Sequence, residues 1–95
     1  MISQTELKTI DFHYFNVMQM GCFAVYLQSK NTKHFWGIHV VEYPTFRNFK
    51  VYHKHNSHDQ YHRHRDARNL KVAIEQIKSH DAFQLNGRKY IKNNK

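Results

Sequence analysis

The segment that most constrains the fold is residues 22–43, where two apolar runs flank the polar residues 30–33. Apolar side chains recur at every second position of both runs, at Phe23, Val25, Leu27, Trp36, Ile38 and Val40. Successive side chains of a β-strand point to opposite faces of a sheet, so this spacing predicts a β-hairpin. Asn31 tolerates left-handed backbone and suits the short turn that a hairpin requires.

A third strand is predicted over residues 46–53. Pro44 ends the second strand, because proline has no backbone donor for the hydrogen bonds of a sheet. Phe49 and Val51 share one face of the third strand, and Arg47 falls on that face close to the strand end. The core face of the resulting antiparallel meander is expected to carry Phe23, Val25, Leu27, Trp36, Ile38, Val40, Phe49 and Val51.

The N-terminal segment admits two interpretations. Ser3 and Glu6 have the spacing of a helix capping box, and apolar residues recur at helical spacing as far as Met18. Gly21 is well placed just past the end of such a helix. The alternative is a strand over residues 12–20, which are rich in strand-forming side chains. The helix is preferred, because the aromatic residues of this segment do not alternate as one strand face requires.

The C-terminal third predicts an amphipathic helix over residues 66–80, with Asp66 as its cap. One apolar stripe of this helix consists of Ala67, Leu70, Ala73, Ile74 and Ile77, and the side expected to face water carries Arg68, Lys71, Glu75 and Lys78. Asn86 and Gly87 indicate a turn. Beyond the helix, a short closing hairpin or a packed tail is expected from Phe83, Leu85, Tyr90 and Ile91, with residues 92–95 frayed.

These elements predict an α+β fold with the order α-β-β-β-α in one small domain, residues 1–95. It is a three-stranded antiparallel meander, or a four-stranded one, packed against the C-terminal helix. The single cysteine, Cys22, excludes an intramolecular disulfide and suits a reducing compartment. No secretory leader is visible and no apolar run reaches the ~20 residues of a membrane span, so a cytoplasmic location without membrane contact is expected.

Charge is the strongest indication of function. Fifteen Lys and Arg residues against seven Asp and Glu residues give a net charge of +8. Such an excess attracts polyanions, chiefly nucleic acid. The sequence therefore predicts a small basic module that contacts the phosphate backbone of RNA or DNA without catalysis. The simplest alternative is a soluble protein that is merely basic.

Two groups of residues are candidates for this contact. The first is a basic edge where a polar segment runs into the C-terminal helix, formed by Arg63, Arg65, Arg68 and Lys71 together with His62 and His64. Protonation of these histidines is expected to strengthen binding as the pH falls from about 7.5 to 6. The second group lies on the sheet face away from the core, where Tyr26, Phe35 and Tyr52 would stack on bases beside Lys50 and Lys54. The opposing expectation is that the N-terminal segment, or a second chain in a homodimer, covers this face.

Five histidines crowd residues 53–64, at His53, His55, His58, His62 and His64. The segment has few apolar groups and predicts a solvated loop. Three functional alternatives remain: phosphate contact, a transition-metal site, and a histidine-based ribonuclease assisted by Arg63 or Arg65. No cysteine or paired carboxylate completes a recognisable metal site, so no metal ligand, catalytic residue or cofactor is assigned.

A protein partner is the main alternative to nucleic acid. Small size, unusual composition and the lack of motifs also suit an inhibitor or adaptor of the kind that phages and other mobile elements encode. Such a protein binds a host enzyme or protein complex, for example as an anti-defence or anti-CRISPR protein.

Overall fold

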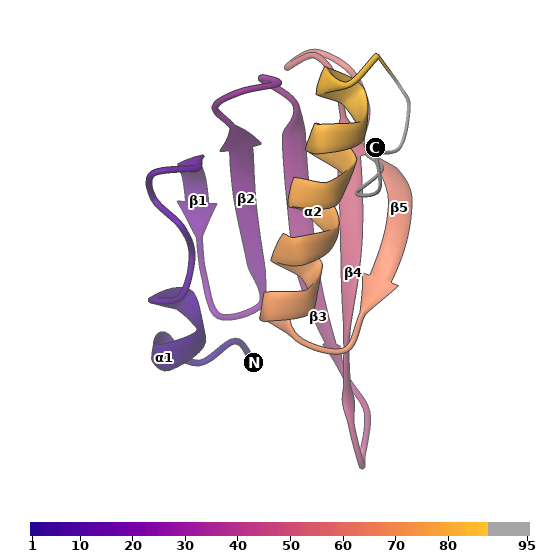
Figure 1. Ribbon diagram of the computed structural model, residues 1–95. Helices are drawn as coiled ribbons and strands as arrows, with labels where there is room; N and C mark the ends of the chain where they lie inside the picture. Colours follow the sequence, from indigo (N-terminus) through magenta and orange to yellow (C-terminus); the bar gives the residue numbers. More distant parts are fainter. Residues whose placement is uncertain (88–95) are drawn as a thin grey trace, which may run out of the picture.

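Five antiparallel strands form one sheet in the order β1-β2-β3-β4-β5, and a long helix, α2, lies across one face of it (Figure 1). In chain order the elements are α1 (Gln4–Leu7), β1 (Phe15–Met20), β2 (Ala24–Ser29), β3 (Phe35–Glu42), β4 (Arg47–Lys54), β5 (His62–Ala67) and α2 (Leu70–Leu85). They come from a computed structural model that describes residues 1–87. The α+β class and the C-terminal helix are confirmed, but the sheet has a further strand at each edge of the predicted meander.

The N-terminal segment is mostly strand, so the preferred long helix is wrong. The capping box is present, with Glu6 N donating to Ser3 Oγ at 3.1 Å and Ser3 N donating to Glu6 Oε1 at 3.0 Å, but α1 has only four residues. The chain then turns at Asp11 and enters β1, which pairs with β2 and buries Phe15. The aromatic spacing argued against a strand because β1 begins only at Phe15, after Phe12 and Tyr14; a bulge then follows at Met18.

The central hairpin and the third strand are confirmed. Val25 pairs with Ile38 and Leu27 with Trp36, so every second side chain faces the core as predicted. Phe23 is the exception and is 58% exposed, because it lies in the turn before β2 begins. In the turn between β2 and β3, Lys33 adopts the left-handed backbone (φ 66°) that was expected of Asn31.

The segment around residues 53–64 contains more regular structure than predicted. β5 pairs with β4 from His53↔His62 to Phe49↔Ala67, so the last three residues of the expected loop and Asp66 belong to an edge strand. Helix α2 starts later than predicted, with Asn69 rather than Asp66 as its cap, and Asn69 Oδ1 accepts a hydrogen bond from Val72 N at 2.8 Å. The predicted apolar stripe is buried.

Helix α2 also ends later than expected, at Leu85. Phe83 and Leu85 therefore belong to the helix rather than to a closing hairpin or tail. Gly87 follows with a φ of 66°. The remaining expectations for the C-terminus, on Tyr90, Ile91 and residues 92–95, lie outside the described residues. Within residues 1–87, neither helix has the length and hydrophobicity that crossing a membrane requires.

The core lies between α2 and the sheet and contains one buried carboxylate, Asp81, on α2. Asp81 Oδ2 accepts hydrogen bonds from the Tyr14 hydroxyl at 2.6 Å and from Ser29 Oγ at 2.5 Å. Its Oδ1 accepts from Thr32 Oγ1 at 3.0 Å. Three hydroxyl donors therefore compensate the desolvation of this charge and tie α2 to the residue before β1, to the end of β2 and to the β2–β3 turn.

The N-terminal segment packs on the same side of the sheet as α2. Arg47, on the core face of β4, makes two hydrogen bonds of 3.0 Å to the Glu6 carboxylate, and this pairing lowers the pKa of Glu6 to about 2. Lys78 of α2 pairs with Asp11 at 3.0 Å. These contacts, with the buried side chain of Leu7 in the core, leave the opposite face of the sheet without a covering element from residues 1–87.

Candidate nucleic-acid interface

The sheet face opposite α2, here called the outer face, carries aromatic and basic side chains in register. In the central row Tyr26 of β2 pairs with Gly37 of β3, Gly37 pairs with Tyr52 of β4, and Tyr52 pairs with Arg63 of β5. Antiparallel pairing places such residues side by side on one face. The row therefore presents two phenol rings and a guanidinium group across four strands.

Two further rows flank this one. On one side Phe35 pairs with Lys54, and on the other His39 pairs with Lys50. This arrangement confirms the predicted direction of all five outer-face candidates, since Tyr26, Phe35, Lys50, Tyr52 and Lys54 all lie opposite the buried core positions. The predicted covering by the N-terminal segment is not found, because its buried side chains join the core on the other face.

The rings of the outer face contact one another. The Tyr26 hydroxyl and His39 Nε2 are 2.6 Å apart and share a hydrogen bond, and the His39 and Tyr52 ring centroids are 4.8 Å apart. Tyr61, just before β5, approaches Tyr26 with a centroid distance of 5.8 Å. Partial burial in this layer lowers the pKa of His39, because desolvation disfavours the charged imidazole. These contacts between neighbouring rings hold the aromatic side chains of the outer face in position.

The cations of the outer face lie against these rings. Lys54 Nζ is 4.4 Å from the Tyr61 ring centroid and 5.5 Å from that of Phe35, and Arg63 Cζ is 5.7 Å from that of Tyr52. Arg63 also pairs with Asp66, whose pKa is lowered by hydrogen bonds from Asn48 and from Arg63. Cations held beside half-buried rings can neutralise phosphates while the accessible parts of the rings stack on bases.

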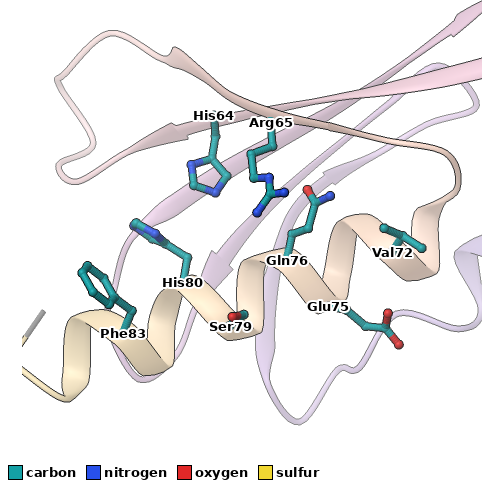
Figure 2. A pocket seen from close by; sticks show the side chains of 8 residues that line it. All are labelled: His64, Arg65, Val72, Glu75, Gln76, Ser79, His80 and Phe83. Carbon is teal, nitrogen blue, oxygen red and sulfur yellow. The ribbon is translucent and has the colours of Figure 1, made fainter. Parts of the chain in front are cut away.

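The predicted basic edge is divided between two sides of the molecule. A bulge at His64 places Arg63 opposite Tyr52 on the outer face but Arg65 opposite Val51 on the α2 side. Figure 2 shows Arg65 pointing from β5 toward α2, where it lines a cavity of about 510 Å³ with Gln76 and other residues. Arg68 and Lys71 are exposed near the start of α2. The four cations therefore do not all lie on one face of the sheet.

The histidines of β4 and β5 meet two others that sequence reasoning did not include. His34, before β3, and His80, on α2, both lie against the buried His53, with centroid distances of 5.0 Å and 4.9 Å. Burial, reinforced by the neighbouring histidines, lowers the pKa of His53 to about 3. His62 pairs with His53 on the same side of the sheet. His53 therefore lies in a packed group of imidazoles at one end of the core, whereas the connection between β4 and β5, with His55 and His58, is exposed as predicted.

His64 belongs to this cluster as well. Burial, with His80 and Arg65 nearby, lowers its pKa to about 4. The expectation that His64 gains charge between pH 7.5 and 6 is therefore wrong, because the imidazole stays neutral throughout that interval. Its contact with phosphate as a cation is not supported.

Sequence reasoning missed Gly37 and Tyr61 as parts of the interface. Alternation with Phe35 places His39 on this face, but His39 was not among the predicted binding residues, and Tyr61 could have been found only with the β4–β5 pairing known. Comparison of the chain with protein-family models, with curated proteins and with solved structures gave no match.

Proposed function

We propose that the protein is a nucleic-acid-binding module without catalysis, and that its outer face receives a single strand of RNA or DNA. The observation that carries this proposal is the row Tyr26–Gly37–Tyr52–Arg63, flanked by Phe35 with Lys54 and by His39 with Lys50. Rings and cations lie beside one another on a face that no element of residues 1–87 covers.

The chemistry of the face suits unpaired bases. Stacking of a base on an aromatic side chain contributes about 1–3 kcal/mol and tolerates any base, because every base has a π-face. Tyr26, Tyr52 and Phe35 supply the stacking surfaces, and Lys50, Lys54 and Arg63 neutralise the phosphates between them. Paired bases in a duplex expose only their edges, so duplex DNA would use the cations alone.

The basic residues off the outer face act at longer range in this proposal. Arg65, Arg68 and Lys71 add to the positive field that raises the association rate, and they do not contact the bound strand. Their effect is expected to vanish as salt screens it, with a Debye length of about 8 Å at physiological ionic strength.

The test is an anisotropy titration of a labelled single-stranded oligonucleotide at several salt concentrations. Three phosphates neutralised on a single strand predict a slope of log K against log salt of about −2. A duplex of equal length should bind more weakly, because it offers no bases for stacking. Absence of binding to RNA and DNA single strands at low salt would overturn the proposal in favour of a protein partner, such as a host enzyme that this chain inhibits.

A further inference from the structure

Three histidines in and next to the neighbouring strands β3 and β4 converge at the end of the sheet near the β2–β3 turn. His34 directly precedes β3, His53 lies in β4, and His55 follows β4. Strands β3 and β4 pair next to them, at Trp36↔His53. One nitrogen from each of the three rings lies within 4.8 Å of the other two.

The spacing of His34 and His53 is close to that of two ligands on one metal ion. His53 Nε2 and His34 Nδ1 are 3.0 Å apart and share a hydrogen bond. Two nitrogen ligands at 2.0–2.1 Å from a tetrahedral zinc ion lie roughly 3.3 Å apart. A metal ion could therefore take the place of the proton shared by His34 and His53 if the two rings move apart by a few tenths of an ångström. The displaced proton then moves to the other nitrogen of its own ring.

His55 supplies the third nitrogen and is the movable member. Its ring stacks on His34 with a centroid distance of 4.1 Å and an interplanar angle of 14°. Stacked rings direct their lone pairs along parallel planes, so His55 must turn toward the ion. Its side chain is exposed, which leaves room for this rotation.

His53 is the fixed member of the group. It is 2% exposed, and the Trp36 ring packs against it with a centroid distance of 4.1 Å. Packing of this kind orients a ligand before the ion arrives, which reduces the ordering that binding requires. A buried, neutral imidazole is also the form that coordinates a metal.

We propose that His34, His53 and His55 bind one divalent transition-metal ion of the zinc class, with water in the fourth position. The ligand set selects the metal, because imidazole suits Zn²⁺, Cu²⁺, Ni²⁺ and Co²⁺, whereas Mg²⁺ and Ca²⁺ require oxygen ligands. The site lies on the α2 side of the sheet end and uses none of the outer-face residues, so it is independent of the proposed nucleic-acid contact.

This site differs from the metal site that the sequence left open. That alternative drew on the histidines of residues 53–64, among which His58 and His62 have a helical i,i+4 spacing. Here His34 comes from a distant turn, and neither His58 nor His62 belongs to the group of three. His58 lies near the tip of the β4–β5 connection with its side chain 84% exposed.

Isothermal titration of the untagged chain with Zn²⁺ tests the proposal, with tetrahedral Co²⁺ absorption as a second readout. We expect one ion per chain at micromolar affinity. His55→Ala and His34→Ala should each raise the dissociation constant by roughly 10–100-fold or more. His58→Ala is the matched control and should change it by less than about 2-fold, which is the ordinary tolerance of an exposed site.

His55 is exposed, so its replacement leaves the core intact and a loss of zinc binding cannot be caused by unfolding. Circular dichroism of each variant checks that it is folded. Zinc should also raise the melting temperature of the wild-type chain and not that of His55→Ala. The proposal is overturned if no zinc binds at micromolar concentrations, if His55→Ala binds as tightly as wild type, or if His58→Ala loses as much affinity as His55→Ala.

Discussion

A Cβ atom on Gly37 would lie 2.9 Å from Cε1 of Tyr26, so the tyrosine ring occupies the space that any side chain at position 37 would need. This close approach lets the ring lie across β3 and bring its hydroxyl to His39 Nε2 at 2.6 Å. Glycine is unfavourable in the middle of a strand unless something else packs closely there. The arrangement of Tyr26 on the outer face therefore depends on Gly37.

Substituting Gly37→Ala should displace the Tyr26 ring and weaken binding of a single-stranded oligonucleotide. Loss of one stacked base corresponds to about 1–3 kcal/mol, which is a 5-fold to 150-fold higher dissociation constant. Gly21→Ala is the matched control, because the nearest atom to its Cβ would be 3.6 Å away. Anisotropy titrations of both variants check the prediction, and equal affinities would contradict it.

Removing the Tyr14 hydroxyl should destabilise the fold. Tyr14→Phe deletes one of the three hydroxyl donors to the buried Asp81 carboxylate, and a hydrogen bond to a charged group contributes about 1.5–3 kcal/mol. Urea unfolding measures the loss in the free energy of unfolding. Tyr43→Phe, on an exposed residue, should cost less than about 0.5 kcal/mol. Similar decreases in the free energy of unfolding for the two variants would show that the hydrogen bond from Tyr14 to Asp81 does not stabilise the fold.

Stability should fall as the pH drops below about 6.5. The pKa values of His53 and His64 are lowered to about 3 and about 4 in the folded state, whereas an unfolded histidine titrates near 6.5. At pH values between these folded and unfolded pKa values, the unfolded chain binds more protons than the folded protein, so acid favours unfolding. The contribution of the two neutral imidazoles to the free energy of unfolding is therefore complete only above about pH 7.

Between pH 7.5 and 5 each of these histidines should lower the free energy of unfolding by about 2 kcal/mol. Urea unfolding at both pH values, with a chelator present so that bound metal does not contribute, measures the sum. A free energy of unfolding that stays constant, or that rises at pH 5, would show that the two imidazoles titrate normally in the folded protein.

Local signals in the sequence predicted much of the fold. The alternation through Leu27 and Trp36 located the central hairpin, and the stripe through Leu70 and Ile77 located the helix face, because these patterns need only neighbouring residues. The capping box at Ser3 was also predicted, but it indicates where a helix starts and not how long it continues. This is why the segment that forms β1 was taken for helix.

The edge strands and the candidate sites depend on contacts between distant residues. β5 has almost no apolar alternation, and its strand conformation depends on pairing with β4. The bulge in this pairing is what places Arg63 and Arg65 on opposite faces of the sheet. His34 reaches His53 only because β3 and β4 are neighbours. No spacing within a single segment of the sequence shows such proximity, whereas the outer-face residues follow from alternation once the strands are known.

The most direct test of the account compares charge reversal on the two sides of the sheet. Lys50→Glu with Lys54→Glu acts on the outer face, and Arg65→Glu with Lys71→Glu changes the net charge equally on the α2 side. After both variants are shown to fold, each is titrated with a single-stranded oligonucleotide at physiological salt. The account predicts that the outer-face variant loses affinity by roughly 10-fold or more, while the α2-side variant stays within about 3-fold of wild type. Equal losses, or a larger loss in the α2-side variant, would contradict binding at the outer face.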